Sequence, residues 1–148
     1  MRLWHKDLIP YLPRQQLIAQ WRECCAIAGS IAKKGTPNHL LVNKVLGYHY
    51  NQFYEYTHCV WKELTKRGYK VSKQSMVNFN SNIFNGCNYF NNEENNVYSI
   101  KEVFKNWHND RYLRQCLFNL QEKYDCGGIP KEEWEVIEYH FAGMLEWR

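Results

Sequence analysis

The stretch PRQQLIAQWRECCAIAGSIAKK, residues 13–34, decides the fold of this chain. Its apolar side chains recur at alternating steps of four and three residues, which is the spacing that places them on one face of an α-helix. Pro13 suits the first helical turn, and Gly35-Thr36-Pro37 ends the pattern. We therefore predict a helix from about residue 13 to 34 whose buried face comprises Leu17, Trp21, Cys24, Ala28 and Ile31.

Helical patterns continue along the rest of the chain. A second helix is predicted over about 51–67, with Gly68 as its C-terminal cap and Phe53, Tyr56, Val60 and Leu64 inward. The capping box Ser99-Ile100-Lys101-Glu102 opens a short helix near 100–107. Two more helices run from Asn109 or Asp110 to about 125 and from Pro130 to about 142. We expect an all-α fold, a compact single-domain helical bundle over residues 1–148 with three main helices plus short helices.

Residues 78–96 differ from their surroundings in composition. They contain nine asparagines and few charges, and asparagine favours turns over helix interiors. We predict a long surface loop here and favour a dispensable insertion over a functional lid.

Length and composition exclude several classes of protein. The chain has 148 residues, 45% apolar and 23% charged, which is ordinary for one globular domain. It has no run of the ~18 apolar residues that a membrane span needs, and its start does not resemble a signal peptide. We expect a cytoplasmic protein whose six cysteines are reduced thiols. No Cys or His spacing indicates a metal site, and no cofactor is predicted.

Charge is unevenly distributed along the chain. Residues 1–74 hold 12 Lys and Arg against 4 Asp and Glu, a net +8, whereas residues 75–148 hold 7 against 11, a net −4. Such asymmetry indicates either a basic face that binds an anionic partner, most often a nucleic acid, or a solvated face without a partner.

Glu23 stands out on the first predicted helix. It projects from a face of small or amide side chains and is flanked by Arg14, Arg22, Lys33 and Lys34. A carboxylate repels phosphate, so phosphate binding alone does not explain its place among positive charges. Glu23 is either a catalytic group or part of an ordinary surface ion pair.

Two stretches carry a family resemblance. Met1-Arg2-Leu3 with residues 16–23, QLIAQWRE, and Lys66-Arg67-Gly68-Tyr69 resemble the phage endonuclease V type of pyrimidine dimer DNA glycosylase and AP lyase. The longer opening through Cys24 looks like the bacterial branch of that family, and residues 120–123 give a weaker match. The resemblance implies an endonuclease V-like helical fold in a monomer of bacterial or phage type, acting on double-stranded DNA with pyrimidine dimers or abasic sites.

The resemblance also implies a mechanism. The N-terminal α-amine, here that of Met1, attacks C1′ of the damaged nucleotide, and the imine that forms leads to strand cleavage by β-elimination. Glu23 matches the essential carboxylate, while a base of the complementary strand is flipped into the protein. An α-amine is a suitable nucleophile because, unlike lysine, an appreciable fraction is neutral near neutral pH. The residues that we expect to contact DNA are Arg2, Arg14, Gln16, Arg22, Lys33 and Lys123.

This sequence departs from the family pattern at several positions. Arg2 is too large for the usual removal of the first methionine, so we expect Met1 itself to supply the amine. Gln16 stands where the family has a histidine, and Ala26 where it has a phosphate-contacting arginine. The family's aromatic, basic C-terminal segment is replaced by the acidic residues 132–138. Two alternatives stay open: a non-catalytic helical module that binds DNA or RNA, and a glycosylase or AP lyase for other lesions.

Overall fold

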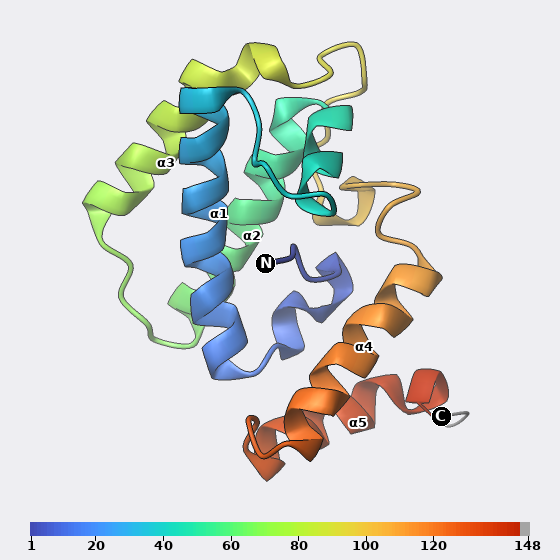
Figure 1. Cartoon of the computed structure of the whole chain (residues 1–148). Helices are drawn as coiled ribbons and strands as arrows, with labels where there is room; N and C mark the ends of the chain where they lie inside the picture. The colour runs from blue at the N-terminus through green and yellow to red at the C-terminus, as the bar shows by residue number, and fades with distance from the viewer. Residues whose placement is uncertain (146–148) are drawn as a thin grey trace.

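The computed structural model describes residues 1–145, and every regular element among them is helical. This confirms the predicted all-α fold, which Figure 1 shows. The α-helices are α1 (Arg14–Lys34), α2 (Tyr50–Lys66), α3 (Lys73–Gly86), α4 (Asp110–Asp125) and α5 (Lys131–Leu145). The 3-10 helices are η1 (Lys6–Tyr11), η2 (Val42–Gly47), η3 (Cys87–Tyr89) and η4 (Ile100–Glu102). None of the described helices is long and apolar enough to cross a bilayer.

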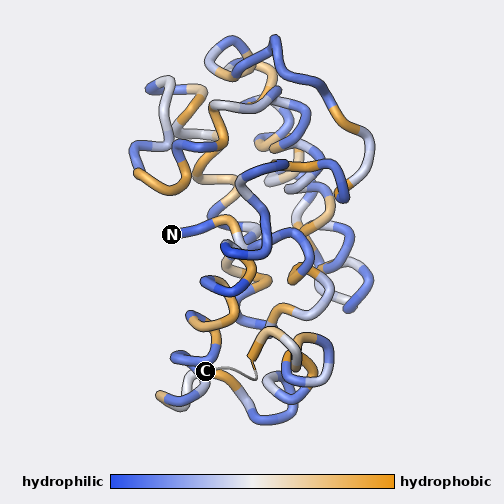
Figure 2. The backbone as a smooth tube through the Cα atoms, turned by 90° about the vertical axis from the view of Figure 1, so that its right-hand side faces the viewer, coloured by the Kyte–Doolittle hydropathy of each residue, from blue (hydrophilic) through white to orange (hydrophobic). Residues whose placement is uncertain are grey.

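Helix α1 lies at the centre of the larger part of the molecule. It packs against α2 and α3, while α4 packs on α5 at the other end (Figure 1). All five predicted core positions of α1 are buried, and so are the four of α2. Hydrophobic and hydrophilic segments alternate within each helical coil of Figure 2, as amphipathic helices around a shared core require.

The chain begins and ends its helices at the expected signals. Gly35 takes a left-handed φ of 78° and donates its N–H to Ile31 O. Gly68 takes a φ of 87° and follows Arg67, the residue that caps α2. Glycine adopts this conformation without the steric penalty that a Cβ brings. The side chain of Asn109 accepts a hydrogen bond from Tyr112 N and so caps α4.

The prediction of a loop over residues 78–96 is wrong for its first part. Residues 73–86 form α3, capped by the side chain of Ser72, and only residues 90–99 are irregular. Phe79 and Ile83 are buried, and a Cβ on Gly86 would lie 3.2 Å from backbone atoms of Ala32 in α1. The helix forms because this packing outweighs the weak helix propensity of asparagine, a matter of tenths of a kcal/mol per residue.

The predicted helix near 100–107 is also shorter than expected. Helix η4 ends at Glu102, and Phe104 and Asn106 have positive φ values of 55° and 74°. Gln52 Oε1 on α2 accepts a hydrogen bond from Phe104 N here at 2.8 Å. A buried side chain on α2 therefore satisfies a backbone N–H that a longer helix would have used.

Candidate functional site

Residues 3 and 4 are held in place from two sides. Leu3 and Trp4 are buried, Tyr112 on α4 donates a hydrogen bond to Leu3 O at 2.7 Å, and Tyr56 on α2 donates to Trp4 O at 2.6 Å. Burial raises the pKa of both tyrosines, so their hydroxyl groups keep the protons that they donate. Met1 is 55% exposed and extends from this anchored segment to the surface. In Figure 1 the N-terminus lies between α1 and α4.

Gln20 joins this segment to helix α1. Its Oε1 accepts a hydrogen bond from Trp4 N at 2.8 Å and lies 3.0 Å from the Tyr56 hydroxyl oxygen. Its Nε2 donates to Arg2 O at 3.0 Å and lies 3.4 Å from Glu23 Oε2. One buried amide thus fixes the path of residues 2–4 and holds the carboxylate of Glu23 beside the backbone of Arg2.

Of the catalytic pair expected from the sequence, Glu23 lies near the backbone of Arg2, the residue that follows Met1. Glu23 lies one turn after Gln20 on α1, is partly exposed, and shares a hydrogen-bond donor with the residue that follows Met1. A carboxylate at this place can stabilise a cation that forms at the N-terminal amine, or accept a proton from a group bound there.

Arg2 packs against aromatic rings. Its guanidinium lies 5.4 Å from the centre of the Trp4 ring and 5.8 Å from that of Tyr112, and Nη1 lies 3.6 Å from Cys116 Sγ. These cation–π contacts hold the positive charge next to the N-terminus.

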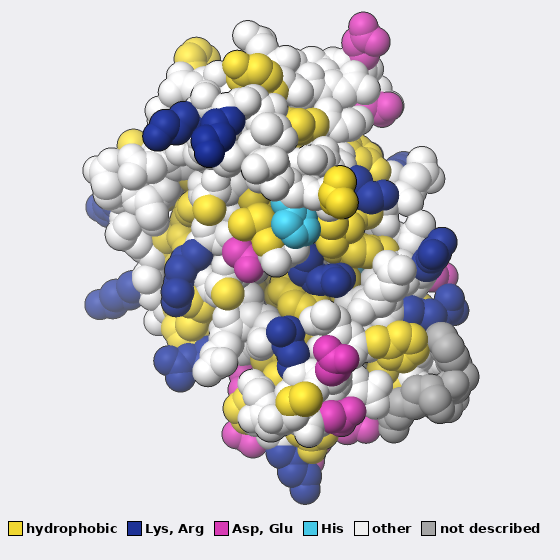
Figure 3. Space-filling model, viewed as in Figure 1, with side chains coloured by type: hydrophobic (Ala, Val, Ile, Leu, Met, Phe, Trp, Pro, Cys, Tyr) yellow, Lys and Arg dark blue, Asp and Glu magenta, His cyan; other side chains and the backbone are white. Residues whose placement is uncertain are grey.

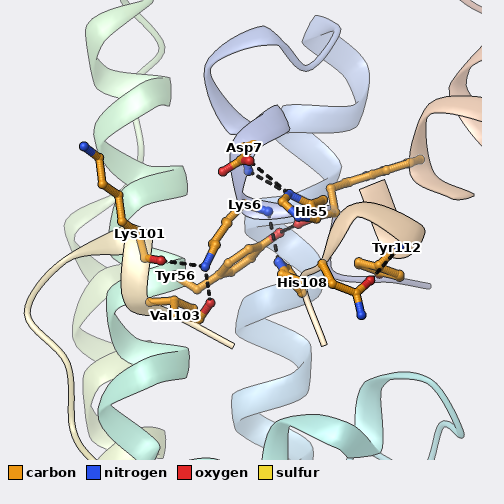
Figure 4. Close-up of polar contacts among 10 residues, drawn as sticks. His5, Lys6, Asp7, Tyr56, Lys101, Val103, His108 and Tyr112 are labelled. Atoms are coloured by element: carbon orange, nitrogen blue, oxygen red, sulfur yellow. Dashed lines mark hydrogen bonds and ion pairs between the residues drawn. The ribbon is translucent and has the colours of Figure 1, made fainter. Parts of the chain in front are cut away.

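A second layer of polar contacts lies beneath the N-terminal segment, and Figure 4 shows it. The rings of His5 and His108 stack with centroids 5.1 Å apart, and His108 Nδ1 accepts a hydrogen bond from Lys6 N at 2.9 Å. The ammonium of Lys6 donates to Lys101 O at 2.8 Å and to Val103 O at 2.7 Å. These contacts tie the start of the chain to the segment before α4.

Both stacked histidines are neutral in the folded protein. Burial lowers the pKa of His108 well below its usual value, and the neighbouring His5 and Lys6 lower it further. Burial also lowers the pKa of His5, more than the nearby Asp7 raises it. The N–H of Asp7 donates to His5 Nδ1, so that nitrogen carries no proton, and its 3.9 Å approach to the Asp7 carboxylate is not an ion pair.

We expect the protein to lose stability as the pH falls below about 6.5. Unfolded histidines take up protons in that range, whereas His5 and His108 in the folded chain resist them, so acid favours unfolding. Melting curves at pH about 7.5 and about 5.5 measure the effect, and a fall of about 2–4 °C corresponds to each 1 kcal/mol lost in a domain of this size. His108→Gln keeps a hydrogen-bond acceptor and should reduce the fall, while the exposed control His140→Gln should leave it unchanged. An equal fall in all three proteins would contradict the assignment.

Three of the residues expected to contact DNA line one groove. Arg14, Gln16 and Arg22 border a hollow of about 550 Å³ between the first half of α1 and the segment that leads into α5. The guanidinium of Arg14 lies 5.6 Å from the centre of the Tyr69 ring, and its backbone N–H donates to Glu133 Oε1 at 2.6 Å. Gln16 Oε1 is buried and has no hydrogen-bond partner among the described residues.

The remaining two expected contacts lie elsewhere. Lys33 is in the last turn of α1 and Lys123 is in the last turn of α4, at opposite ends of the molecule in Figure 1. The structure therefore does not bring the six expected DNA contacts into one cluster. In Figure 3, Lys and Arg side chains are spread over the face that carries the N-terminus, and acidic side chains gather toward the α5 end.

Sequence reasoning missed the residues that build this site. The sequence gives one indication of the role of Gln20. It lies next to Trp21 in the buried stripe of α1, and a buried amide needs hydrogen-bond partners inside the protein. The roles of Tyr56, Tyr112 and His108 have no sequence signal, since their partners are 52 to 109 residues away.

Comparison with known proteins gives one finding. A family model for pyrimidine dimer DNA glycosylase matches residues 1–76, which include η1, α1 and α2. No curated protein and no solved structure matches the chain.

Proposed function

Because the chain belongs to the pyrimidine dimer DNA glycosylase family, we propose that it cleaves the glycosidic bond at a pyrimidine dimer and then cuts the strand as an AP lyase. The observation that carries this proposal is the contact of Gln20 Nε2 with both Arg2 O and Glu23 Oε2. It supports a site in which an α-amine and a carboxylate act on the same nucleotide.

The proposed nucleophile is the α-amine of Met1. Its neutral nitrogen bonds to C1′ as the C1′–N glycosidic bond breaks and the base leaves. The amine then loses a proton, O4′ takes one up, and the opened sugar is left as an imine. The anchored segment that follows Met1 favours this attack because it limits the positions that the amine can adopt.

The proposed role of Glu23 follows from its charge and place. Its carboxylate stabilises the cationic sugar and the protonated imine, and then removes a proton from C2′. The electron pair of that C–H bond forms the C2′–C3′ double bond as the C3′–O bond to phosphate breaks. Water afterwards hydrolyses the imine and releases the free amine.

Three of the proposed DNA contacts lie on the same elements as this pair of groups. Arg2 presents a positive charge beside the amine, and Arg14 and Arg22 border a groove on the same helix as Glu23. Arginine binds phosphate with two parallel hydrogen bonds, which suits it to hold the backbone of a bent duplex.

Borohydride trapping tests the proposed function. Reduction of the imine should link the full chain covalently to duplex DNA that carries one abasic site, and the enzyme should incise duplex DNA with one defined cis-syn thymine dimer. Trapping without incision at the dimer would favour an AP lyase for other lesions. Binding with neither trapping nor incision would overturn the proposal in favour of a non-catalytic module.

Arg22→Ala should weaken the binding of damaged and undamaged duplex DNA about equally. The side chain is exposed and lines the groove, so its loss should remove one phosphate contact and reduce the slope of log K against log salt by about 0.9. Lys131→Ala, in the acidic helix α5, is the control and should leave the slope unchanged. An unaltered slope in Arg22→Ala would count against this residue as a backbone contact.

A further inference from the structure

Leu40 is almost entirely exposed to water. Its exposed fraction is 93%, the highest among the large apolar residues that the structure leaves at the surface. It lies in residues 36–43, which lead from α1 into the first two residues of η2 and which we call the Leu40 turn. A side chain with no polar atom gains nothing from this position in the free protein, whereas burial against a partner would stabilise it.

The Leu40 turn is held rigidly by its own side chains. Asn43 Oδ1 accepts hydrogen bonds from His39 N at 3.1 Å and from Thr36 Oγ1 at 3.2 Å, while Asn43 N donates to His39 O at 2.7 Å. Ser30 on α1 donates to Thr36 O at 2.7 Å. A turn that is already ordered loses little conformational entropy when it binds, so Leu40 is presented in a fixed position.

The turn lies beside the candidate active site. A hollow of about 320 Å³ is bordered by Leu41, Lys44, Trp107, Arg111, Tyr112 and Gln115, together with two asparagines. Tyr112 also donates to Leu3 O and lies under the guanidinium of Arg2. It therefore lines the hollow and contacts the N-terminal segment as well. In Figure 1 the turn crosses in front of α2 directly above the N-terminus.

The charges around the hollow favour an anionic partner. Of the eight described residues that line it, Lys44 and Arg111 are positively charged and none is negatively charged. Both cations are exposed. Leu41, the chain neighbour of Leu40, borders the hollow together with these two cations. An exposed apolar residue beside such a hollow matches the chemistry of a DNA duplex, which has phosphates outside and stacked apolar base faces within.

We propose that Leu40 is a wedge that enters the base stack of duplex DNA at the lesion, with Lys44 and Arg111 holding phosphates beside it. The inference rests on the proposed function and adds a residue that selects distorted DNA. A damaged or abasic position is already partly unstacked, so inserting Leu40 there requires less energy than inserting it into intact duplex.

Leu40→Ala tests the wedge, and Phe84→Ala is the matched control because Phe84 is 79% exposed on α3. The probe is a duplex with a tetrahydrofuran abasic analogue next to 2-aminopurine, whose fluorescence rises when it unstacks. Binding of the wild-type chain and of Phe84→Ala should raise the fluorescence. Leu40→Ala should remove most of the rise and weaken binding to this duplex about tenfold, with an unchanged salt slope because no charge is lost.

The design separates the wedge from the proposed function. Single-stranded abasic DNA has no duplex base stack to open, so trapping on it measures the lyase reaction alone. The ratio of trapping on duplex to trapping on single-stranded DNA should therefore fall about tenfold in Leu40→Ala. Suppose that the wild-type chain forms the trapped adduct on both substrates while Leu40→Ala equals it in fluorescence rise, affinity and trapping ratio. That result would show that the wedge proposal is wrong and that Leu40 contacts another partner, such as a protein. If the wild-type chain traps on neither substrate, the proposed function fails.

Discussion

A chain with a short extension ahead of Met1, or with an acetylated Met1 amine, is expected to lose borohydride trapping and strand incision together. Both changes remove the primary amine that forms the imine, and we expect the loss to exceed about 10³-fold because no second group replaces a covalent nucleophile. Binding to undamaged duplex should persist, since the groove bordered by Arg14 and Arg22 is unchanged. Trapping yield and incision rate measure the effect.

Mass spectrometry of the trapped product gives the decisive check on this prediction. The deoxyribose remnant should be attached to the amine of Met1. Lys6 is the nearest lysine in sequence, and its ammonium is held by the carbonyls of Lys101 and Val103, so it is not free to attack a sugar. A remnant on Lys6 or on another lysine, with Met1 unmodified, would contradict the mechanism.

Glu23→Gln is expected to abolish strand cleavage and leave DNA binding intact or tighter. The substitution keeps the shape of the side chain but removes the charge that stabilises the sugar cation and the base that removes the C2′ proton. We expect incision to fall by about 10²–10⁴-fold, the range for loss of a positioned acid or base. Affinity should not fall, because one negative charge near the phosphates is gone. Single-turnover incision and a binding titration measure the two effects separately.

Glu135→Gln is the control for this charge change. Glu135 is exposed on α5 and lies 3.9 Å from Lys131, so its replacement should alter neither measurement. Full lyase activity in Glu23→Gln would mean that Glu23 is an ordinary surface residue despite its contact with Gln20.

Local sequence signals determined most of the helices. The stripes of α1 and α2 are buried as predicted, and Gly35, Gly68 and Asn109 lie at the helix ends that they indicated. Periodicity and caps are effective guides because both depend on residues within about four positions of each other. The predicted helix also places Glu23 one turn after Gln20, since both residues lie on α1.

Only the tertiary structure decided how the site is assembled. Residues 78–86 are helical because Phe79 and Ile83 are buried in the shared core, against the local preference of their asparagines. The N-terminal segment is held against α1 because Gln20, Tyr56 and Tyr112 bond to its backbone. The two tyrosines lie 52 and 109 residues along the chain from their partners. Burial and long-range hydrogen bonds depend on which elements meet in space. No pattern over a few residues contains that information, and so the anchors of the N-terminus became visible only in the folded chain.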